Sequence, residues 1–265
     1  MITPILLLGA GNMGGAIIDG WLKAGTFAPS DLMIVDPRPG PAALKAQAAG
    51  AVLNPPNSDL AAAKTVVVCV KPQMWRDAAA FYAASLAADA VIVSVVAGVG
   101  ARDLAQAFGD RAVARVMPTT AVAINQGTAS LYAGDPSAAA RAHILFEPLG
   151  TVVDLFDEHQ MHAATAVSGS APAYLYAFVE SLEAAGAAAG LTPADANRLA
   201  RATIIGAAAL LAQSGVEPAE LRRQVTSPAG TTEAALNVLL GAHGLPQLLR
   251  EAISNAMRRS KELGG

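Results

Sequence analysis

Hydrophobic residues in the first part of the chain come in short runs that end at glycine or proline. ILLL at 5–8, DLMIVDPR at 31–38, KTVVVCVKP at 64–72 and AVIVSVVAG at 90–98 each predict a β-strand. Between them, NMGGAIIDGWLKAG at 12–25 and PAALKAQAAG at 41–50 space their apolar residues as a helix does. Strands that alternate with helices predict parallel strands joined by right-handed crossovers, which is a doubly wound sheet.

The hydrophobic pattern changes near residue 157. AVARVMP at 112–118, GTASLYAG at 127–134 and GTVVDLF at 150–156 are further strand-like runs, whereas residues 158–265 contain only helical patterns separated by glycine and proline. We therefore expect an α/β protein with two domains. Residues 1–157 are predicted to form a Rossmann-like dinucleotide-binding domain, and residues 158–265 an all-α domain.

One predicted helix has no polar side. Residues 204–212, IIGAAALLA, are apolar all round, so we expect that helix to be buried on every side. A helical piece of about a hundred residues has little interior of its own. A homodimer with interleaved helical domains is the favoured explanation, although a helix buried beneath the first domain would produce the same pattern.

The composition limits the partners and the compartment. Hydrophobic residues make up 53% of the chain and charged residues 15%, the net charge is −3, and no run of lysine and arginine favours nucleic acid or a membrane surface. The single cysteine, Cys69, lies in an apolar strand, which fits a reducing compartment. With neither a signal-peptide layout nor an apolar membrane span, we expect a cytoplasmic protein.

The first turn carries a dinucleotide fingerprint. GAGNMG places Gly9, Gly11 and Gly14 in the pattern G-x-G-x-x-G between a strand and a helix, where the helix N-terminus can face a pyrophosphate. Asp36 ends the second strand, where an acid binds the ribose 2′-OH of NAD, but Arg38 follows and can neutralise the 2′-phosphate of NADP. The sequence leaves NADH and NADPH open, and a surface role for Arg38 is the alternative.

Two further segments end strands at the same edge of the predicted sheet. VKPQ at 70–73 and VAGV at 96–99 follow the third and fourth strands, at the rim where a ligand of this fold lies. Lys71 is a candidate contact to a phosphate or a ribose. A lysine at a strand end in water is the simpler alternative.

The side chains that ketone reductases use are missing. No lysine lies between Lys71 and Lys261, and of the four histidines only His243, in GAHG, is in a loop that resembles a site, for which a helix terminus is the simpler explanation. We expect no metal site, since His, Cys and carboxylate residues do not cluster at a useful spacing. A C=N bond suits this absence, because an imine nitrogen is basic enough to be protonated near neutral pH and the protein then has only to orient the substrate.

A second candidate site lies in the helical part. TSPAGTT at 226–232 places Ser227, Thr231 and Thr232 around a proline and a glycine at the start of a helix, where free N–H groups and hydroxyls can hold a carboxylate. SGSAPAY at 168–174 repeats the arrangement. Ordinary N-capping by serine or threonine is the alternative.

Taken together, these segments resemble the pyrroline-5-carboxylate reductase family over nearly the whole chain. They are GAGNMG, VKPQ, VAGV, SGSAPAY, GL at 190–191 and VTSPAGTTEAAL at 225–236, in that order. The resemblance implies reduction of 1-pyrroline-5-carboxylate to L-proline with NADPH or NADH, the last step of proline biosynthesis. It also implies a Rossmann domain followed by a helical domain that interlocks with a second subunit in a homodimer, from which higher oligomers can assemble.

The resemblance also assigns residues. It implies substrate-carboxylate binding by Ser227, Gly230, Thr231 and Thr232, with Thr232 as the catalytic partner of the ring nitrogen. Together with Asp36 and Arg38, the cofactor contacts it implies are Gly9, Gly11, Asn12, Met13, Gly14, Asn57, Val70, Lys71, Pro72, Ala97 and Gly98.

Three departures from the family pattern affect these assignments. MPTTA at 117–121 replaces the usual M-P-N-T-P, so that Thr119 and Ala121 put a contact there in doubt. Ala171 and Ala229 each stand where the family has glycine, and we expect both to adopt ordinary negative φ angles at helix starts.

Two other functions share some of these features. A β-hydroxyacid dehydrogenase has a similar first fingerprint and a helical second domain, but its chemistry relies on a lysine that the gap from Lys71 to Lys261 excludes. A non-catalytic dinucleotide sensor would keep the cofactor fold without turnover, and the hydroxyl-rich segment disfavours it.

Overall fold

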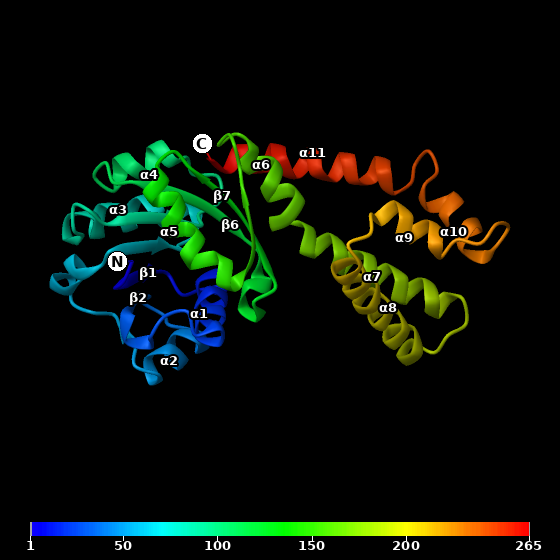
Figure 1. Cartoon of the computed structure of the whole chain (residues 1–265), viewed down its shortest axis with the longest axis horizontal. Helices are drawn as coiled ribbons and strands as arrows, with labels where there is room; N and C mark the ends of the chain where they lie inside the picture. The colour runs from blue at the N-terminus through cyan, green and yellow to red at the C-terminus, as the bar shows by residue number, and fades with distance from the viewer. Residues whose placement is uncertain (1, 265) are drawn as a thin grey trace. The chain divides into compact units, whose positions relative to one another are not determined.

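The computed structural model describes residues 2–264 and divides the chain into two compact units (Figure 1). Unit 1 runs up to Gly169 and includes the segment from Ala256 onward, whereas unit 2 is Ser170–Asn255. The predicted boundary at 157/158 falls inside unit 1, at the end of its last strand, and stays a prediction.

Unit 1 contains one eight-stranded sheet in the order β3-β2-β1-β4-β5-β6-β7-β8. The strands are β1 (Ile5–Leu8), β2 (Leu32–Val35), β3 (Val52–Leu53), β4 (Thr65–Val68), β5 (Val91–Ser94), β6 (Val113–Pro118), β7 (Gly127–Ala133) and β8 (Gly150–Asp154). The first six are parallel, in register Ile5 with Leu32 and Thr65, which confirms the predicted α/β class and its Rossmann-like core.

The parallel arrangement does not extend to the end of the sheet. β7 runs antiparallel to β6, and β8 is parallel to β7. Only residues 119–126 connect β6 to β7, and a parallel crossover needs a dozen or more residues, so the chain must return antiparallel. The expectation of parallel strands throughout is therefore wrong for the last two strands.

Helices cover both faces of the sheet, because successive residues of a buried strand point to opposite sides. α1 (Asn12–Ala24), α2 (Pro41–Ala48) and α5 (Pro136–Phe146) pack on the face to which Ile5 and Leu7 belong. α3 (Trp75–Tyr82) and α4 (Ala101–Ala107) pack on the face to which Leu6 and Leu8 belong. The indole N–H of Trp21 donates to the Leu145 carbonyl at 2.8 Å and ties α1 to α5.

After β8 the chain is helical, as predicted. α6 (Gln160–Ala164) continues into a π-helical turn, Thr165–Gly169, and unit 2 follows with α7 (Ala171–Ala188), α8 (Pro193–Ser214), α9 (Pro218–Gln224) and α10 (Thr231–Leu239). α11 (Leu245–Gly264) begins in unit 2 and ends in unit 1. No helix within residues 2–264 is long and apolar enough to cross a membrane.

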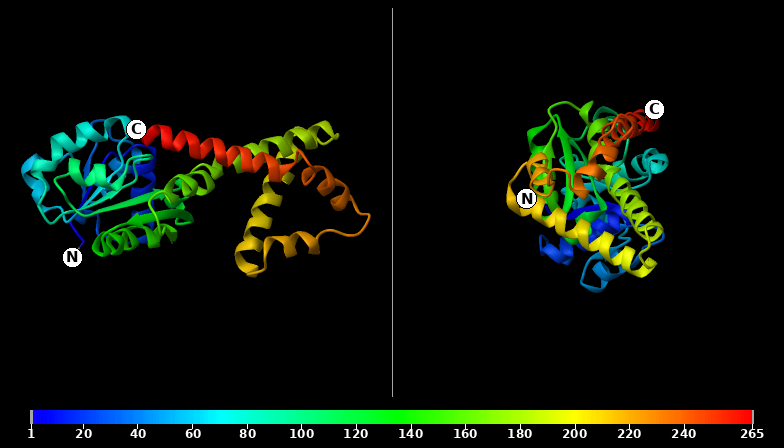
Figure 2. Two further views of the ribbon diagram at one scale, coloured as in Figure 1. Left: turned by 90° about the horizontal axis from the view of Figure 1, so that it is seen from above. Right: turned by 90° about the vertical axis from the view of Figure 1, so that its right-hand side faces the viewer.

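Unit 2 has little interior in a single chain. α7 and α8 pack against each other (Figures 1 and 2), and the only buried residues of α8 are the small Ala196 and Ala200. Ile205 is 70% exposed, Leu210 55% and Leu211 46%. Within the single chain this helix is therefore uncovered, because two paired helices cannot enclose one another. Its burial on every side, by a second copy or beneath the first domain, stays a prediction.

His143 on α5 links that helix to β8 through two carboxylates. Its Nδ1 lies 2.8 Å from Glu147 Oε1, and its Nε2 lies 3.0 Å from Asp154 Oδ1. Burial alone would lower the pKa of His143, but the two carboxylates outweigh it and raise the pKa above its ordinary value. The protonated imidazole therefore stabilises unit 1.

This arrangement predicts how stability depends on pH. A histidine whose folded-state pKa is raised contributes fully below its unfolded pKa of about 6.5, and that contribution is lost as pH rises through the folded pKa. From about pH 6 to pH 9 the thermal unfolding midpoint should fall further for the wild type than for His143→Gln. His243→Gln, which removes a histidine that contacts the Gln247 amide, is the control and should follow the wild type. Parallel curves for all three proteins would contradict the prediction.

Candidate functional site

The glycine fingerprint forms a tight turn between β1 and α1. Gly9 has a φ of +93°, and a Cβ there would lie 3.0 Å from the backbone of Cys69. A Cβ on Gly14 would lie 2.1 Å from the Gly9 carbonyl oxygen, so only glycine lets α1 begin this close to the turn. Nothing lies within 4 Å of the corresponding point on Gly11, which leaves room for a ligand against its backbone.

A cavity of about 510 Å³ opens beside this turn. Gly11 and Asn12 line it from the start of α1, Arg38 from the loop after β2, and Thr120 from the short 3₁₀ helix η5 (Thr120–Ile124). The cavity lies at the carboxyl edge of the parallel strands, where this fold binds dinucleotides. The side chain of Met13, in contrast, packs against the hydrophobic core.

Asp36 holds two turns together at this edge. Its Oδ2 accepts from the Ala10 N–H at 2.7 Å, and its Oδ1 accepts from the Arg38 N–H at 2.8 Å. Asn54 pairs with the backbone of Asp36 through its amide, at 2.9 and 3.0 Å. Both carboxylate oxygens thus hold the protein's own backbone, whereas the Arg38 side chain is exposed and lines the cavity.

The remaining predicted cofactor residues follow the neighbouring strands. Val70, Lys71 and Pro72 come after β4, Ala97 and Gly98 after β5, and Asn57 begins the 3₁₀ helix η2 (Asn57–Ala62) after β3. Because these strands are parallel neighbours, the topology brings all of these residues to one edge of the sheet. They do not line the cavity beside the glycine turn.

The departure at residues 119–121 has a structural explanation. Thr119 is buried, and its hydroxyl accepts from the Thr128 N–H at 3.1 Å, so the side chain is committed to the β6–β7 connection. The next residue, Thr120, is exposed and faces the cavity. Of the two threonines, Thr120 rather than Thr119 is therefore the side chain available to a ligand.

The segment 226–232 breaks unit 2 between α9 and α10, as its proline and glycine predict. The Thr226 hydroxyl donates to the Arg222 carbonyl at 2.6 Å, within the last turn of α9. The hydroxyls of Ser227, Thr231 and Thr232 form no hydrogen bond among the described residues. Ser227 and Thr231 are exposed and Thr232 is half-buried, so three of the four hydroxyls are available to a ligand.

N-capping does not account for these hydroxyls. The N-cap of α10 is Gly230, and that of α7 is Ser170, and neither makes a side-chain capping bond. In the SGSAPAY segment, the Ser168 hydroxyl instead donates to the Ala164 carbonyl at 2.8 Å. The N–H groups at the start of α10 remain without intrahelical partners, as at every helix start, so this end of the helix can hold a negative group.

Ala171 and Ala229 behave differently. Ala171 begins α7 without a positive φ, as expected, but Ala229 has a φ of +56°. The expectation of an ordinary φ at Ala229 is wrong, because the chain needs a left-handed residue to turn from α9 into α10. The Glu233 carboxylate accepts from the Ala229 N–H at 2.7 Å and helps to hold this turn.

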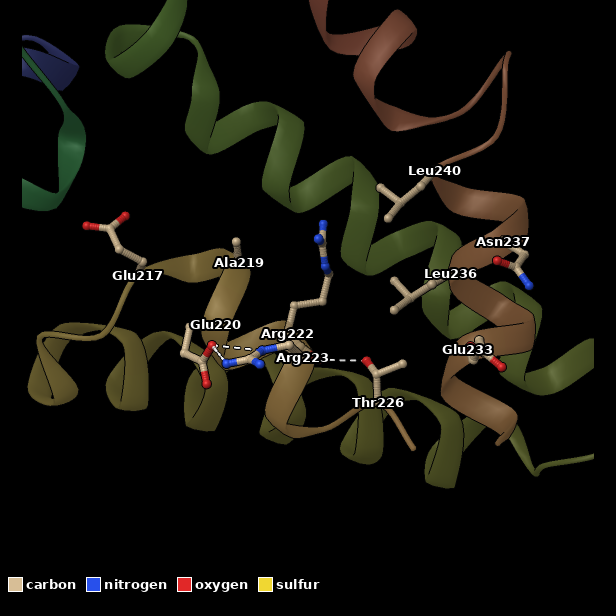
Figure 3. Close-up of a pocket in the computed structure, with 10 residues that line it drawn as sticks. All are labelled: Glu217, Ala219, Glu220, Arg222, Arg223, Thr226, Glu233, Leu236, Asn237 and Leu240. Atoms are coloured by element: carbon tan, nitrogen blue, oxygen red, sulfur yellow. Dashed lines mark hydrogen bonds and ion pairs between the residues drawn. The ribbon is translucent and has the colours of Figure 1, made fainter. Parts of the chain in front are cut away.

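A hollow of unit 2 lies elsewhere, between α9 and α10 (Figure 3). Its volume is about 610 Å³, and Leu236 and Leu240 point into it from α10, while Arg223 pairs with Glu220 on α9. Thr226 and Glu233 line this hollow, but Ser227, Thr231 and Thr232 do not. The three available hydroxyls therefore do not belong to this hollow.

A glycine turn of this geometry on a Rossmann-like sheet, followed by a helical unit, defines a dinucleotide-binding oxidoreductase. Residues 4–98 match the family model described as NADP oxidoreductase, coenzyme F420-dependent, and residues 158–263 match the model described as pyrroline-5-carboxylate reductase dimerisation. The pyrroline-5-carboxylate reductase of Pseudomonas aeruginosa is 39% identical over 99% of this chain and 98% of its own length.

Solved structures agree with the sequence comparison. The pyrroline-5-carboxylate reductase of Coxiella burnetii is 28% identical, covers 100% of both chains and has a TM-score of 0.90. The Plasmodium falciparum pyrroline carboxylate reductase with NADP bound shares the fold, with a TM-score of 0.86 at 24% identity over 99% of this chain and 98% of that one. The chain belongs to the pyrroline-5-carboxylate reductase family.

Three residues that the site uses are not among those predicted from the sequence. Thr120 gives no signal, because nothing in a pair of threonines shows which one faces a cavity. Asn54 has a φ of +51° and holds Asp36, and its position after a short strand is a weak indication of such a turn. Glu233 lies three residues after Gly230, the N-cap of α10, where a glutamate often caps a helix start. The sequence alone shows this pattern.

The left-handed Ala229 yields a stability prediction. Ala229→Gly should stabilise the protein by about 0.5–1 kcal/mol, because the removed Cβ strain exceeds the added flexibility of the unfolded chain. Ala171→Gly is the matched control. It makes the same chemical change at a residue without a positive φ and should lower stability by a few tenths of a kcal/mol or more. Denaturant unfolding measures both, and equal losses in the two variants would contradict the strained φ.

Proposed function

We propose that this protein reduces 1-pyrroline-5-carboxylate to L-proline with NADPH, in the last step of proline biosynthesis. The observation that carries the proposal is the loop from Ser227 to Thr232, which offers three unpaired hydroxyls, among the described residues, beside the free N–H groups of a helix N-terminus. The reaction matches the names of the relatives with which the chain shares its family.

The residues at the carboxyl edge of the sheet fit a nicotinamide dinucleotide. The open space at Gly11 and the start of α1 suit a pyrophosphate, and the cavity of about 510 Å³ extends from there to Arg38. When bound, the reduced nicotinamide supplies the hydride that converts the C=N bond to C–N. Lys71, Ala97 and Gly98 follow strands β4 and β5 and would hold the half of the cofactor that carries the nicotinamide.

Arg38 and Asp36 favour NADPH over NADH. Each oxygen of the Asp36 carboxylate already accepts one backbone N–H bond, which leaves fewer of its acceptor sites for a ribose 2′-OH. The Arg38 guanidinium faces the cavity and suits the 2′-phosphate, with donors for a bidentate contact. The relative from Plasmodium falciparum has NADP bound, which supports the same preference.

The hydroxyl loop would bind and orient the substrate. Ser227 and Thr231, with the N–H groups of the first turn of α10, can donate to the substrate carboxylate, and Gly230 keeps this approach open. The ring nitrogen is protonated in the reactive iminium, and the Thr232 hydroxyl oxygen can accept its N–H. No strong proton donor is needed, since the nitrogen keeps its proton while the carbon is reduced.

The two other functions are less well supported. A β-hydroxyacid dehydrogenase would need a lysine in the helical part, where the chain has none before Lys261. A dinucleotide sensor would not need three available hydroxyls on a loop whose Ala229 is held at a positive φ.

The helical region also supports self-association. Leu175 and Tyr176 of α7 and Ile205 of α8 are exposed and line one apolar groove, and the matching family model describes dimerisation. We infer a homodimer that buries this groove, on which larger assemblies can be built. A cytoplasmic location would suit both the cofactor and Cys69, whose buried thiol has a raised pKa and is unreactive.

The substrate loop can be tested with variants that remove or keep a single hydroxyl group. Thr232→Val should lower kcat/KM for 1-pyrroline-5-carboxylate by about 10- to 100-fold, the loss expected for a hydrogen bond to a charged group, while the KM for NADPH stays unchanged. Thr232→Ser keeps the hydroxyl and should retain most of the activity. Thr226→Val is the matched control, because its hydroxyl is bonded to Arg222. A Thr231→Val, Thr232→Val double variant with wild-type kcat/KM would contradict the proposed site.

Cofactor preference has its own test. Arg38→Ala should raise the KM for NADPH by about 10- to 100-fold and leave the KM for NADH nearly unchanged, because only NADPH carries the 2′-phosphate. Lys64→Ala removes one positive charge at the opposite edge of the sheet, beside the start of β4, and controls for net charge. An equal rise in both KM values, or none in either, would exclude Arg38 as the residue that recognises the phosphate.

A further inference from the structure

The loop between β5 and α4, residues 95–100, contains Ala97 and Gly98. These two residues are assigned to the nicotinamide end of the cofactor, so a role inferred for this loop rests on the proposed function. Val96 and Val99 anchor the loop to the core with their buried side chains, whereas Ala97 and Gly98 are half-buried, and Gly98 has a φ of +82°. The loop leads directly into the first residue of α4, Ala101.

Glu158 fixes the end of this loop from a distant part of the chain. Its Oε1 accepts from the Ala101 N–H at 2.7 Å and from Nη1 of Arg115 at 2.7 Å. The first N–H groups of a helix have no partner within the helix, so the Glu158 carboxylate supplies the acceptor that Ala101 lacks. Because Glu158 follows β8 and Arg115 lies on β6, the bond joins the loop to the sheet.

Arg115 is a charged residue within the apolar run AVARVMP, and it is only 5% exposed. Such a charge is costly to bury, and the ion pair with Glu158 compensates it. His162 lies nearby but adds no negative charge that could pair with Arg115. Burial and the charges of Arg115 and Lys261 lower its pKa and favour the neutral imidazole, whose Nδ1 lies 2.9 Å from the Ser260 hydroxyl. Glu158 is therefore the anionic partner that keeps Arg115 in place, and Arg115 in turn orients Glu158.

Apolar packing holds the loop at Val96 and Val99, but Gly98 and Gly100 have no side chains of their own to pack. A polar pocket of about 280 Å³ lies beside these two glycines, with Arg115, Glu158 and Asp103 in its wall. The bond from the Ala101 N–H to Glu158 therefore adds a polar constraint where the glycines provide no apolar one. Asp103 lines the same pocket but makes no hydrogen bond to the loop among the described residues.

We propose that Glu158, held by Arg115, is a positioning residue that fixes the loop 95–100 for the nicotinamide end of the cofactor. Without the Glu158 carboxylate the loop is free to move in the unbound protein, and cofactor binding then has to order it. The loss appears in cofactor affinity, since no atom of Glu158 has to touch the cofactor.

Two variants of the full-length protein test this role. Glu158→Ala removes the acceptor, but it leaves Arg115 buried without a counter-charge and risks unfolding. The double variant Arg115→Met, Glu158→Ala removes both charges and still deprives Ala101 of its partner. Each folded variant should bind NADP⁺ with a Kd raised about tenfold, as expected for the loss of a hydrogen bond to a charged group. Asp103→Ala removes a carboxylate from the same pocket and should keep the wild-type Kd.

Titration calorimetry with NADP⁺ gives the Kd, and circular dichroism gives the folded fraction. A merely structural role would lower the number of binding sites per chain and leave the Kd unchanged. A double variant with the wild-type Kd, or an Asp103→Ala variant that loses as much affinity, overturns the positioning role. A wild type that does not bind NADP⁺ overturns the proposed function as well. Failure of the positioning role alone, in contrast, leaves NADP⁺ binding by the wild type intact.

Discussion

The carboxylate of Asp36 holds the cofactor edge of this protein together. With one oxygen on the Ala10 N–H and the other on the Arg38 N–H, it joins the glycine turn to the loop after β2. The turn itself exists only because Gly14 carries no Cβ, which would overlap the Gly9 carbonyl oxygen. This arrangement leaves the Arg38 side chain at the cavity, so the hydrogen bonds that build the glycine turn also place the cation proposed to bind the 2′-phosphate.

The two units contribute different chemistry. Unit 1 offers backbone groups and cations at the ends of parallel strands, which suit a phosphorylated dinucleotide. Unit 2 offers three hydroxyls and a helix N-terminus, which suit a small carboxylate. Reduction of a protonated imine requires no strong acid or base for proton transfer, because the nitrogen keeps its proton. The chemistry of the substrate thus replaces a catalytic group that other oxidoreductases must supply.

Much of the fold can be predicted from the sequence, because short apolar runs and glycine breaks define the strands and helices locally. The antiparallel direction of β7 can also be predicted from the sequence, because residues 119–126 are too few for a parallel crossover. That prediction uses the length of the connection as well as the pattern of the strands. Other features depend on contacts between distant segments. The positive φ of Ala229, the commitment of Thr119 to Thr128 and the bond from Ala101 to Glu158 arise where the chain meets itself. The exposure of Ile205 likewise depends on how much a single chain can enclose.

The central claim is that this protein reduces a cyclic imine to an amino acid with NADPH. It is tested most directly by incubating the purified protein with 1-pyrroline-5-carboxylate and NADPH and measuring both nicotinamide absorbance and proline. One proline should form for each NADPH oxidised, at a rate proportional to protein concentration. NADPH that remains reduced, or is oxidised without formation of proline, would contradict the claim.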